Sequence, residues 1–274
     1  MMLSRLWKSF VNNRKSIQSH KNKNMKRNDL EKYLNNLLDL EKYHDMCPNG
    51  LQVEGRPEIK KIVTGVSACV ELFEEALARN ADAVLTHHGV IWNFEKPLYK
   101  GGYKKRIKLL LENDVNLFGY HLPLDGDPAF GNNALIANLL NVQDVQPFDE
   151  YKGAYIGCSG SFDNLPPEQL FELVKKEINP DAQFFPFGPE KINSIGIISG
   201  GAQKEIKEAV LQGLDVFLTG EASEHIYHYA KEEGIHFIAA GHHATEVFGV
   251  QALGKHIREK FGIEVEFVNI HNPI

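Results

Sequence analysis

The fold is decided by residues 61–89, which read KIVTGVSACVELFEEALARNADAVLTHHG. Lys61 to Ser67 is a short β-rich run closed by small residues, Val70 to Arg79 has the apolar spacing of a helix, and Ala83 to Thr86 is a second apolar strand. The same patterns predict a helix over residues 29–40, a second helix over residues 104–113 and a strand over residues 115–120. The resulting βαβαβ order predicts a mostly parallel sheet covered by helices.

The same order of elements returns in the second half of the chain. Residues 192–202, 212–223 and 232–246 match the three earlier strand regions in order, although the sequence identity is weak. We interpret this match as a duplication, and the alternative is that any two Rossmann-like halves share this order. Between the two halves, residues 168–178 are expected to form a helix and residues 184–187 a strand or a sheet edge.

The composition is that of an ordinary globular protein. Of the 274 residues, 43% are hydrophobic and 24% are charged, which excludes a collagen-like, low-complexity or wholly disordered chain. The sequence has no apolar run of about 18 residues, so we expect no membrane partner. Cys47, Cys69 and Cys158 are far apart and form no CxxC pair, which favours a reducing compartment and a cytoplasmic location.

Charge is distributed unevenly along the chain. Residues 1–27 carry eight bases and no acid, which leaves 22 bases and 36 acids, a net charge of −14, in the rest. That acidic body makes nucleic acid an unexpected partner, because phosphate binding needs clustered cations. We interpret residues 1–27 as a disordered or mis-assigned extension, with Met25 as a candidate true start; organelle targeting and a nucleic-acid arm are the alternatives.

Polar side chains follow three of the predicted strands, at the point where each strand ends. They lie in the segments Thr86-His-His-Gly89, His121-Leu-Pro-Leu-Asp125 and Gly241-His-His-Ala-Thr-Glu246. In open α/β sheets, ligands bind outside the carboxyl ends of the strands. Each segment pairs histidine with histidine or with a carboxylate, so we expect a binding site at these strand ends.

Histidine and carboxylate at these positions are typical of metal ligands. The candidate ligands are His87, His88, Asp125, His242 and Glu246. Five donors exceed the three protein ligands of a catalytic zinc, so two divalent ions fit better. Imidazole and carboxylate without thiolate suit zinc, iron or manganese. Taken singly, Asp125 could be a turn aspartate and Glu246 a first-turn helix carboxylate.

Two further residues are candidates near these ligands. Pro123 predicts that Asp125 lies on a loop, and we expect His121 to orient Asp125 from outside the metal ligands. Glu221 follows the strand end that matches the His-His pair, so it is a candidate proton acceptor; its alternative role is a carboxylate at a helix N-terminus. His121 and Glu221 are thus the candidate catalytic residues. We expect the long helix toward Phe261 to begin at Thr245-Glu246.

Several motifs recur in order along the chain. They are NGLQVEG at 49–55, THHG at 86–89, HLPLD at 121–125, GNN at 131–133 and GHHATE at 241–246. Together they resemble the NIF-three-like family, known in bacteria as GTP cyclohydrolase 1 type 2 homologues, from about residue 28 to the C-terminus. The resemblance implies that His87, His88, Asp125, His242 and Glu246 hold a dinuclear divalent metal site.

The resemblance also implies an architecture and an assembly. The expected fold is α/β, with two intertwined, duplicated lobes whose mixed, mostly parallel sheets are flanked by helices. The first lobe would contain residues 28–140 plus 241–274, with the C-terminal segment returning to it, and the second would contain residues 141–240. The expected assembly is a ring-shaped homohexamer.

The expected function is metal-dependent hydrolysis of a nucleotide-like small molecule. Bound metal would activate water at neutral pH, and His121 or Glu221 would move protons. The alternative is a non-catalytic, metal-binding hexameric scaffold or adaptor.

Overall fold

The computed structural model describes residues 24–96 and 98–274, which divide into two compact units. The N-terminal unit contains residues 24–124 and 249–271, and the central unit contains residues 125–248 and 272–274. The expected lobe boundaries followed residues 140 and 240, so the division in the structure differs from them. The reason for the first difference is packing, because Ile136 and Ala137 lie in the core of the central unit.

The predicted basic extension ended at residue 27. Its residues 1–23 lie outside the described residues. Met25 and Lys26 form strand β1, which pairs with β3 (Glu58–Ile59), and Arg27 begins helix α2 (Arg27–Leu37). Regular secondary structure therefore includes three residues that were assigned to the extension.

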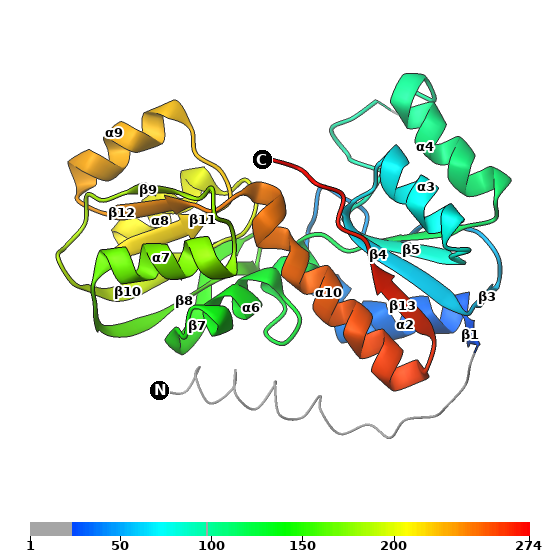
Figure 1. Ribbon diagram of the computed structural model, residues 1–274, viewed down its shortest axis with the longest axis horizontal. Helices are drawn as coiled ribbons and strands as arrows, with labels where there is room; N and C mark the ends of the chain where they lie inside the picture. The colour runs from blue at the N-terminus through cyan, green and yellow to red at the C-terminus, as the bar shows by residue number, and fades with distance from the viewer. Residues whose placement is uncertain (1–23, 97) are drawn as a thin grey trace. The chain divides into compact units, whose positions relative to one another are not determined.

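The N-terminal unit is built on a five-stranded sheet with the order β13-β4-β5-β6-β2. Its strands are β2 (Gly50–Val53), β4 (Lys61–Ser67), β5 (Ala83–His88), β6 (Asn116–Gly119) and β13 (Glu264–Phe267). The pairs β13–β4, β4–β5 and β5–β6 are parallel, and only the edge strand β2 runs antiparallel to its neighbour. Figure 1 shows β4 and β5 beside the two connecting helices.

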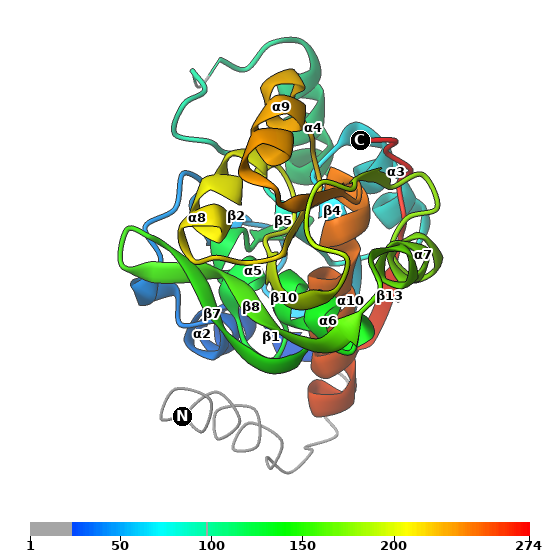
Figure 2. The same cartoon turned by 90° about the vertical axis from the view of Figure 1, so that its left-hand side faces the viewer.

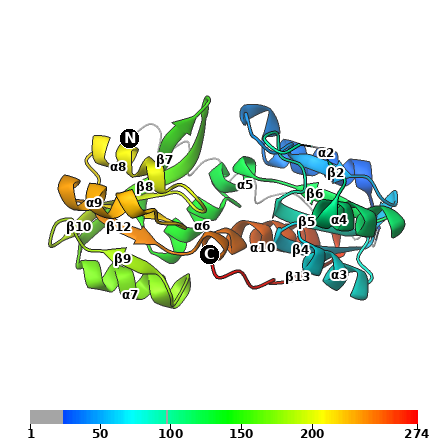
Figure 3. The ribbon, with the colours of Figure 1, turned by 90° about the horizontal axis from the view of Figure 1, so that it is seen from above.

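Helices cover this sheet on both faces. They are α2, the 3-10 turn η1 (Leu40–Lys42), α3 (Val70–Ala78), α4 (Gly101–Glu112) and residues 249–261 of α10 (His242–Phe261). Along β4, Val63 packs with α3 and α4 on one face, and its neighbour Ile62 is buried on the other, because adjacent residues of a strand point to opposite faces. Figure 3 shows α2 and α3 on opposite sides of the strands.

The central unit is built on a six-stranded sheet with the order β7-β8-β10-β11-β12-β9. Its strands are β7 (Gln143–Tyr151), β8 (Ala154–Leu165), β9 (Gln183–Phe185), β10 (Ile192–Ile197), β11 (Val216–Thr219) and β12 (His236–Ala239). The pairs β10–β11 and β11–β12 are parallel, whereas the pairs β8–β10, β9–β12 and β7–β8 are antiparallel. Figure 2 faces this unit and shows the β7–β8 hairpin.

Two apolar cores lie on the two faces of the central sheet. One joins Val216, Leu218 and Ile238 to helices α6 (Asn132–Leu139) and α7 (Pro167–Glu177). The other joins Phe217 and Phe237 to α8 (Ile206–Leu211) and α9 (Glu224–Glu233). The 3-10 turn η2 (Gln203–Glu205) directly precedes α8. The alternation along β11 therefore buries both faces of the sheet, as a covered parallel sheet requires.

The structure confirms the predicted α/β class and the order of the elements in each half. The predicted strand at residues 61–67 is β4, and the apolar run at 83–86 extends two residues further to His88. The pattern analysis did not predict the β7–β8 hairpin, whose turn at Lys152 and Gly153 has two positive φ angles. Among the described residues, no helix combines the length and the apolar character needed to cross a membrane.

Candidate metal-binding residues

Three imidazoles gather at one edge of the N-terminal sheet. His87 and His88 are the last residues of β5, and His121 follows β6. Their candidate ligand nitrogens lie within 4.8 Å of one another, and the ring centroids of His87 and His88 are 4.7 Å apart. The arrangement follows from the sheet, because β5 and β6 are parallel neighbours whose carboxyl ends lie side by side.

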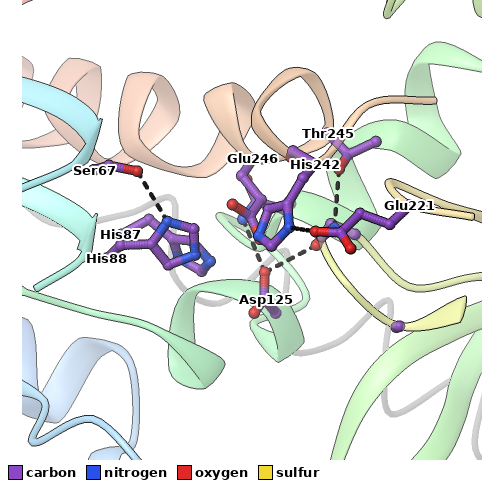
Figure 4. Close-up of polar contacts among 12 residues, drawn as sticks. Ser67, His87, His88, Asp125, Glu221, His242, Thr245 and Glu246 are labelled. Atoms are coloured by element: carbon purple, nitrogen blue, oxygen red, sulfur yellow. Dashed lines mark hydrogen bonds and ion pairs between the residues drawn. The ribbon is translucent and has the colours of Figure 1, made fainter. Parts of the chain in front are cut away.

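Hydrogen bonds at Nδ1 orient these rings. Nδ1 of His87 donates to the backbone carbonyl of Tyr120 at 3.0 Å, and Nδ1 of His121 donates to a carboxylate oxygen of Asp45 at 2.8 Å. Nδ1 of His88 contacts the hydroxyl of Ser67 at 3.1 Å (Figure 4). Because a carbonyl and a carboxylate only accept, the neutral rings of His87 and His121 carry their lone pair on Nε2, the atom that binds metal.

Asp45 holds His121 through a buried network. Its side chain is 2% exposed and accepts hydrogen bonds from His121, from the amide of Asn49 and from the backbone N–H of Leu122. Burial by itself would raise the pKa of Asp45, but the hydrogen bond and charge of His121 outweigh it and lower that pKa to about 2. Asp45 is therefore ionised and fixes the ring of His121.

Asp125 lies in helix α5 (Leu122–Gly126), so its prediction as a loop residue is wrong. Pro123 is the second residue of that helix, where its missing N–H costs no hydrogen bond within the helix. One carboxylate oxygen of Asp125 accepts from the amide of Asn132 and from the hydroxyl of Ser199, both at 2.9 Å. These two buried donors hold the carboxylate in one orientation.

His242 is the first residue of α10 and Glu246 lies one turn later, and the helix begins three residues earlier than predicted. Gly241, with φ of +90°, makes the sharp turn from β12 into this helix. Nε2 of His242 is 3.2 Å from a carboxylate oxygen of Glu246, and the carboxylate oxygens of Glu246 and Asp125 lie within 4.8 Å of each other. Both carboxylates are buried.

Glu221 belongs to the same cluster as His242. Its carboxylate accepts from Nδ1 of His242 at 2.5 Å, as Figure 4 shows. Burial by itself would lower the pKa of His242, but hydrogen bonds and charge interactions with Glu246 and Glu221 raise it to about 9. Glu221 thus orients an imidazole, the same relation that joins Asp45 to His121.

A glycine allows the chain to pass close to these ligands. Gly200 has φ of +67°, and a Cβ atom there would clash with a carboxylate oxygen of Glu246 and lie 3.2 Å from Nε2 of His242. Its N–H donates to the hydroxyl of Thr245. The turn after β10 therefore forms a cradle for Glu246 that no larger residue would fit.

The donor set of each unit fits a divalent metal ion. Three imidazoles belong to the N-terminal unit, and two buried carboxylates with one imidazole belong to the central unit. Two like charges buried within 4.8 Å repel strongly unless cations compensate them. Nitrogen and oxygen donors without thiolate suit zinc, iron or manganese.

Sequence reasoning singled out most of these residues but missed one and placed another differently. It missed Asp45, although the nearby Asn49-Gly50 motif is a signal for the turn that carries it; Asn49 accepts from the backbone N–H of His121 at 2.7 Å. His121 was expected to orient Asp125. In the structure, Nδ1 of His121 is hydrogen-bonded to Asp45, and the ring lies beside the rings of His87 and His88.

Comparison with known proteins places the chain in a family. Residues 25–273 match the model of Duf34/NIF3 (NGG1p interacting factor 3). The chain belongs to this family. One curated member is 45% identical over 246 residues, 89% of this chain and 98% of the relative, and is named GTP cyclohydrolase 1 type 2 homolog, from Haemophilus influenzae.

Solved structures of Duf34/NIF3 relatives share the fold. A protein titled ybgI, of unknown function, is 40% identical, with a TM-score of 0.87 over 91% of this chain and all of its own. TTHA1606 from Thermus thermophilus is 29% identical, with a TM-score of 0.84 over 91% of this chain and all of its own.

Proposed function

We propose that this chain binds two divalent metal ions and is a metal-dependent hydrolase of a nucleotide-like small molecule. The predicted ligands His87 and His88, together with His121, would serve in the N-terminal unit, and the predicted ligands Asp125, His242 and Glu246 would serve in the central unit. The observation that carries the proposal is the pair of buried carboxylates of Asp125 and Glu246, which lie within 4.8 Å of each other beside His242. The cluster of His87, His88 and His121 supports it with three imidazole donors.

The chain's own residues have defined parts in this proposal. Bound divalent ions would supply a water-derived nucleophile near neutral pH and polarise the bond that is broken. Asp45 and Glu221 orient the imidazoles of His121 and His242 through Nδ1, as carboxylates do in histidine–metal sites. Ser199 and Asn132 orient the carboxylate of Asp125.

The substrate class is proposed on the names of relatives. The Haemophilus influenzae relative is named GTP cyclohydrolase 1 type 2 homolog, which makes GTP the first nucleotide to test. The site's donor chemistry suits hydrolysis of other nucleotides equally well.

Two measurements on one preparation test the proposal. Protein purified without chelator is analysed for its metals, and the metal-loaded protein is then incubated with GTP and a panel of nucleotides. We expect about two divalent ions per chain and turnover that His242→Ala abolishes. His228→Ala, an exposed histidine of α9 in the same unit, is the matched control and should keep both properties.

The outcome separates the hydrolase from the scaffold. Metal binding without turnover, with wild type and His242→Ala equally inactive on every nucleotide, would overturn the enzyme and favour a metal-binding scaffold. The homohexamer and the cytoplasmic location stay proposals. A native mass of about six times the chain mass of 30.9 kDa would support the hexamer.

A further inference from the structure

An indole ring lies against the imidazole cluster of the N-terminal unit. The ring centroid of Trp92 is 5.2 Å from that of His121 and 5.9 Å from that of His88. The contact with His121 is edge-on, with an interplanar angle of 79°. Trp92 therefore contacts two of the three imidazoles directly.

Backbone hydrogen bonds anchor the loop that carries Trp92. The N–H of Val90 donates to the side-chain carbonyl of Gln52 at 2.8 Å, and the N–H of Asn93 donates to the carbonyl of Met46 at 2.9 Å. Val90 is itself buried. These bonds lie on both sides of Trp92, so its position beside the histidines is determined by the unit's own structure.

A second aromatic ring extends the surface outwards. Phe94 packs at 5.6 Å from Trp92, with an interplanar angle of 32°, and is 66% exposed. A tryptophan that only shielded the histidines would need no such exposed neighbour. Exposed apolar surface next to a candidate site is typical of a ligand-binding surface.

The charge of the same segment indicates the charge of that ligand. Residues 90–112, which include Trp92 and Phe94, carry six bases and two acids, although the body of the protein is acidic. Lys96 and Lys100 are exposed. This excess of positive charge favours an anionic ligand with an aromatic part.

We propose that Trp92, extended by Phe94, is the stacking surface for the heteroaromatic base of an anionic substrate, a nucleotide, whose reacting part lies at the imidazole cluster. The inference rests on the proposed function, and it names the residue that recognises the base. Stacking on aromatic side chains is tolerant of base identity because every base has a π-face. Trp92 thus selects for a planar base and against a sugar phosphate that lacks one.

The fluorescence of Trp92 itself reports the contact. The chain has two tryptophans, Trp7 and Trp92, so in the variant Trp7→Phe all indole emission comes from Trp92. Metal-loaded Trp7→Phe protein is titrated with GTP and, separately, with ribose 5-phosphate. We expect GTP to quench the emission and ribose 5-phosphate to leave it unchanged. Equal responses to the two ligands, or no response to GTP, would overturn the inference.

Substitutions test how much the stack contributes. Trp92→Ala should weaken GTP binding about 5- to 150-fold and raise KM by a similar factor, with metal content unchanged. Trp92→Phe, which keeps an aromatic face, should restore most of the affinity. Tyr99→Ala is the matched control, because Tyr99 is 62% exposed on the same segment and contacts Tyr103 instead. A Trp92→Ala protein with the wild-type KM and dissociation constant would overturn the inference.

Failure of this inference and failure of the proposed function have different signatures. If GTP quenches Trp92 and no nucleotide is hydrolysed, the hydrolase is wrong and the stacking surface stands. If nucleotides are hydrolysed and Trp92→Ala leaves both kcat and KM unchanged, the stacking surface is wrong and the hydrolase stands.

Discussion

The two units place different donors on the same scaffold. In both, the candidate residues lie at or just after the carboxyl ends of three consecutive parallel strands, β4-β5-β6 in the N-terminal unit and β10-β11-β12 in the central unit. Thr86 and Thr219 occupy the same position when the two halves of the sequence are aligned. Two residues later, the N-terminal unit has His88 and the central unit has Glu221. The N-terminal set thus consists of imidazoles, and the central set is rich in carboxylate.

The two units orient a histidine in the same way, through a hydrogen bond to a carboxylate, although their candidate metal donors differ. An imidazole is held through Nδ1 by an acid in each unit, His121 by Asp45 and His242 by Glu221. The side chain of Asp45 is 2% exposed, whereas that of Glu221 is 32% exposed. Because water screens exposed charges, the same device should be stronger in the N-terminal unit.

The largest expected effect comes from removing an anionic donor. Glu246→Gln should weaken metal binding by more than about 100-fold, beyond the loss caused by an outer partner, because a charged ligand is replaced by a weak neutral one. His88→Gln, which removes a neutral donor from the other set, should cost less. Competition with a chelator of known affinity measures both.

The control for this ranking is His228→Gln on α9, which should bind metal as wild type does. A larger loss in His88→Gln than in Glu246→Gln would reverse the assigned roles of the two sets.

The orienting acids give the next largest effect. Asp45→Asn should weaken metal binding about 10- to 100-fold, because an amide no longer stabilises the required tautomer of His121. Glu221→Gln should cost about tenfold or less, since Glu221 is partly exposed. The same chelator competition measures the difference, and equal losses would show that burial of the acid does not matter here.

The metal-free protein should lose stability at opposite ends of the pH scale through the two sets. The pKa of Asp45 is lowered from 3.8 to about 2, so its contribution, roughly 2 kcal/mol, is present above pH 3.8 and lost as the pH falls through 2. The pKa of His242 is raised from 6.5 to about 9, so its contribution, roughly 3 kcal/mol, is present below pH 6.5 and lost as the pH rises through 9.

Urea unfolding between pH 2 and 10 in the presence of chelator checks both losses. Asp45→Asn should remove only the loss of stability at low pH, and His242→Gln should remove only the loss of stability at high pH. If stability still falls at high pH in His242→Gln, another group causes that loss.

The smallest change to the structure is the loss of one hydroxyl. Ser199→Ala removes a buried hydrogen bond to the carboxylate of Asp125 and should destabilise the metal-free protein by about 1.5 to 3 kcal/mol. Ser67→Ala removes a bond to the neutral ring of His88 and should cost about 1 kcal/mol. Urea unfolding at pH 7 ranks the two, and an equal cost would contradict the difference in charge between the sets.

The regular elements were predictable where the apolar pattern was strong. The run at 61–67 matches β4, and residues 70–79 match α3 to within one residue. The β7–β8 hairpin was not predicted, because Asp144, Asp149 and Asn164 have positive φ and interrupt the alternation that identifies a strand. Pro123 was interpreted as excluding a helix, although proline is tolerated in the first turn, where it lies.

The sequence by itself determined the α/β class, the repeated order of strands and the residue types that follow them, because these depend on local periodicity and on chemistry carried by single positions. Only the tertiary structure decided which acid orients which imidazole. Asp45 and His121 are 76 residues apart, and the Glu221–His242 bond depends on parallel pairing of β11 with β12. Contacts between distant residues depend on how strands pair and pack in space, and periodicity along the chain contains no record of that pairing.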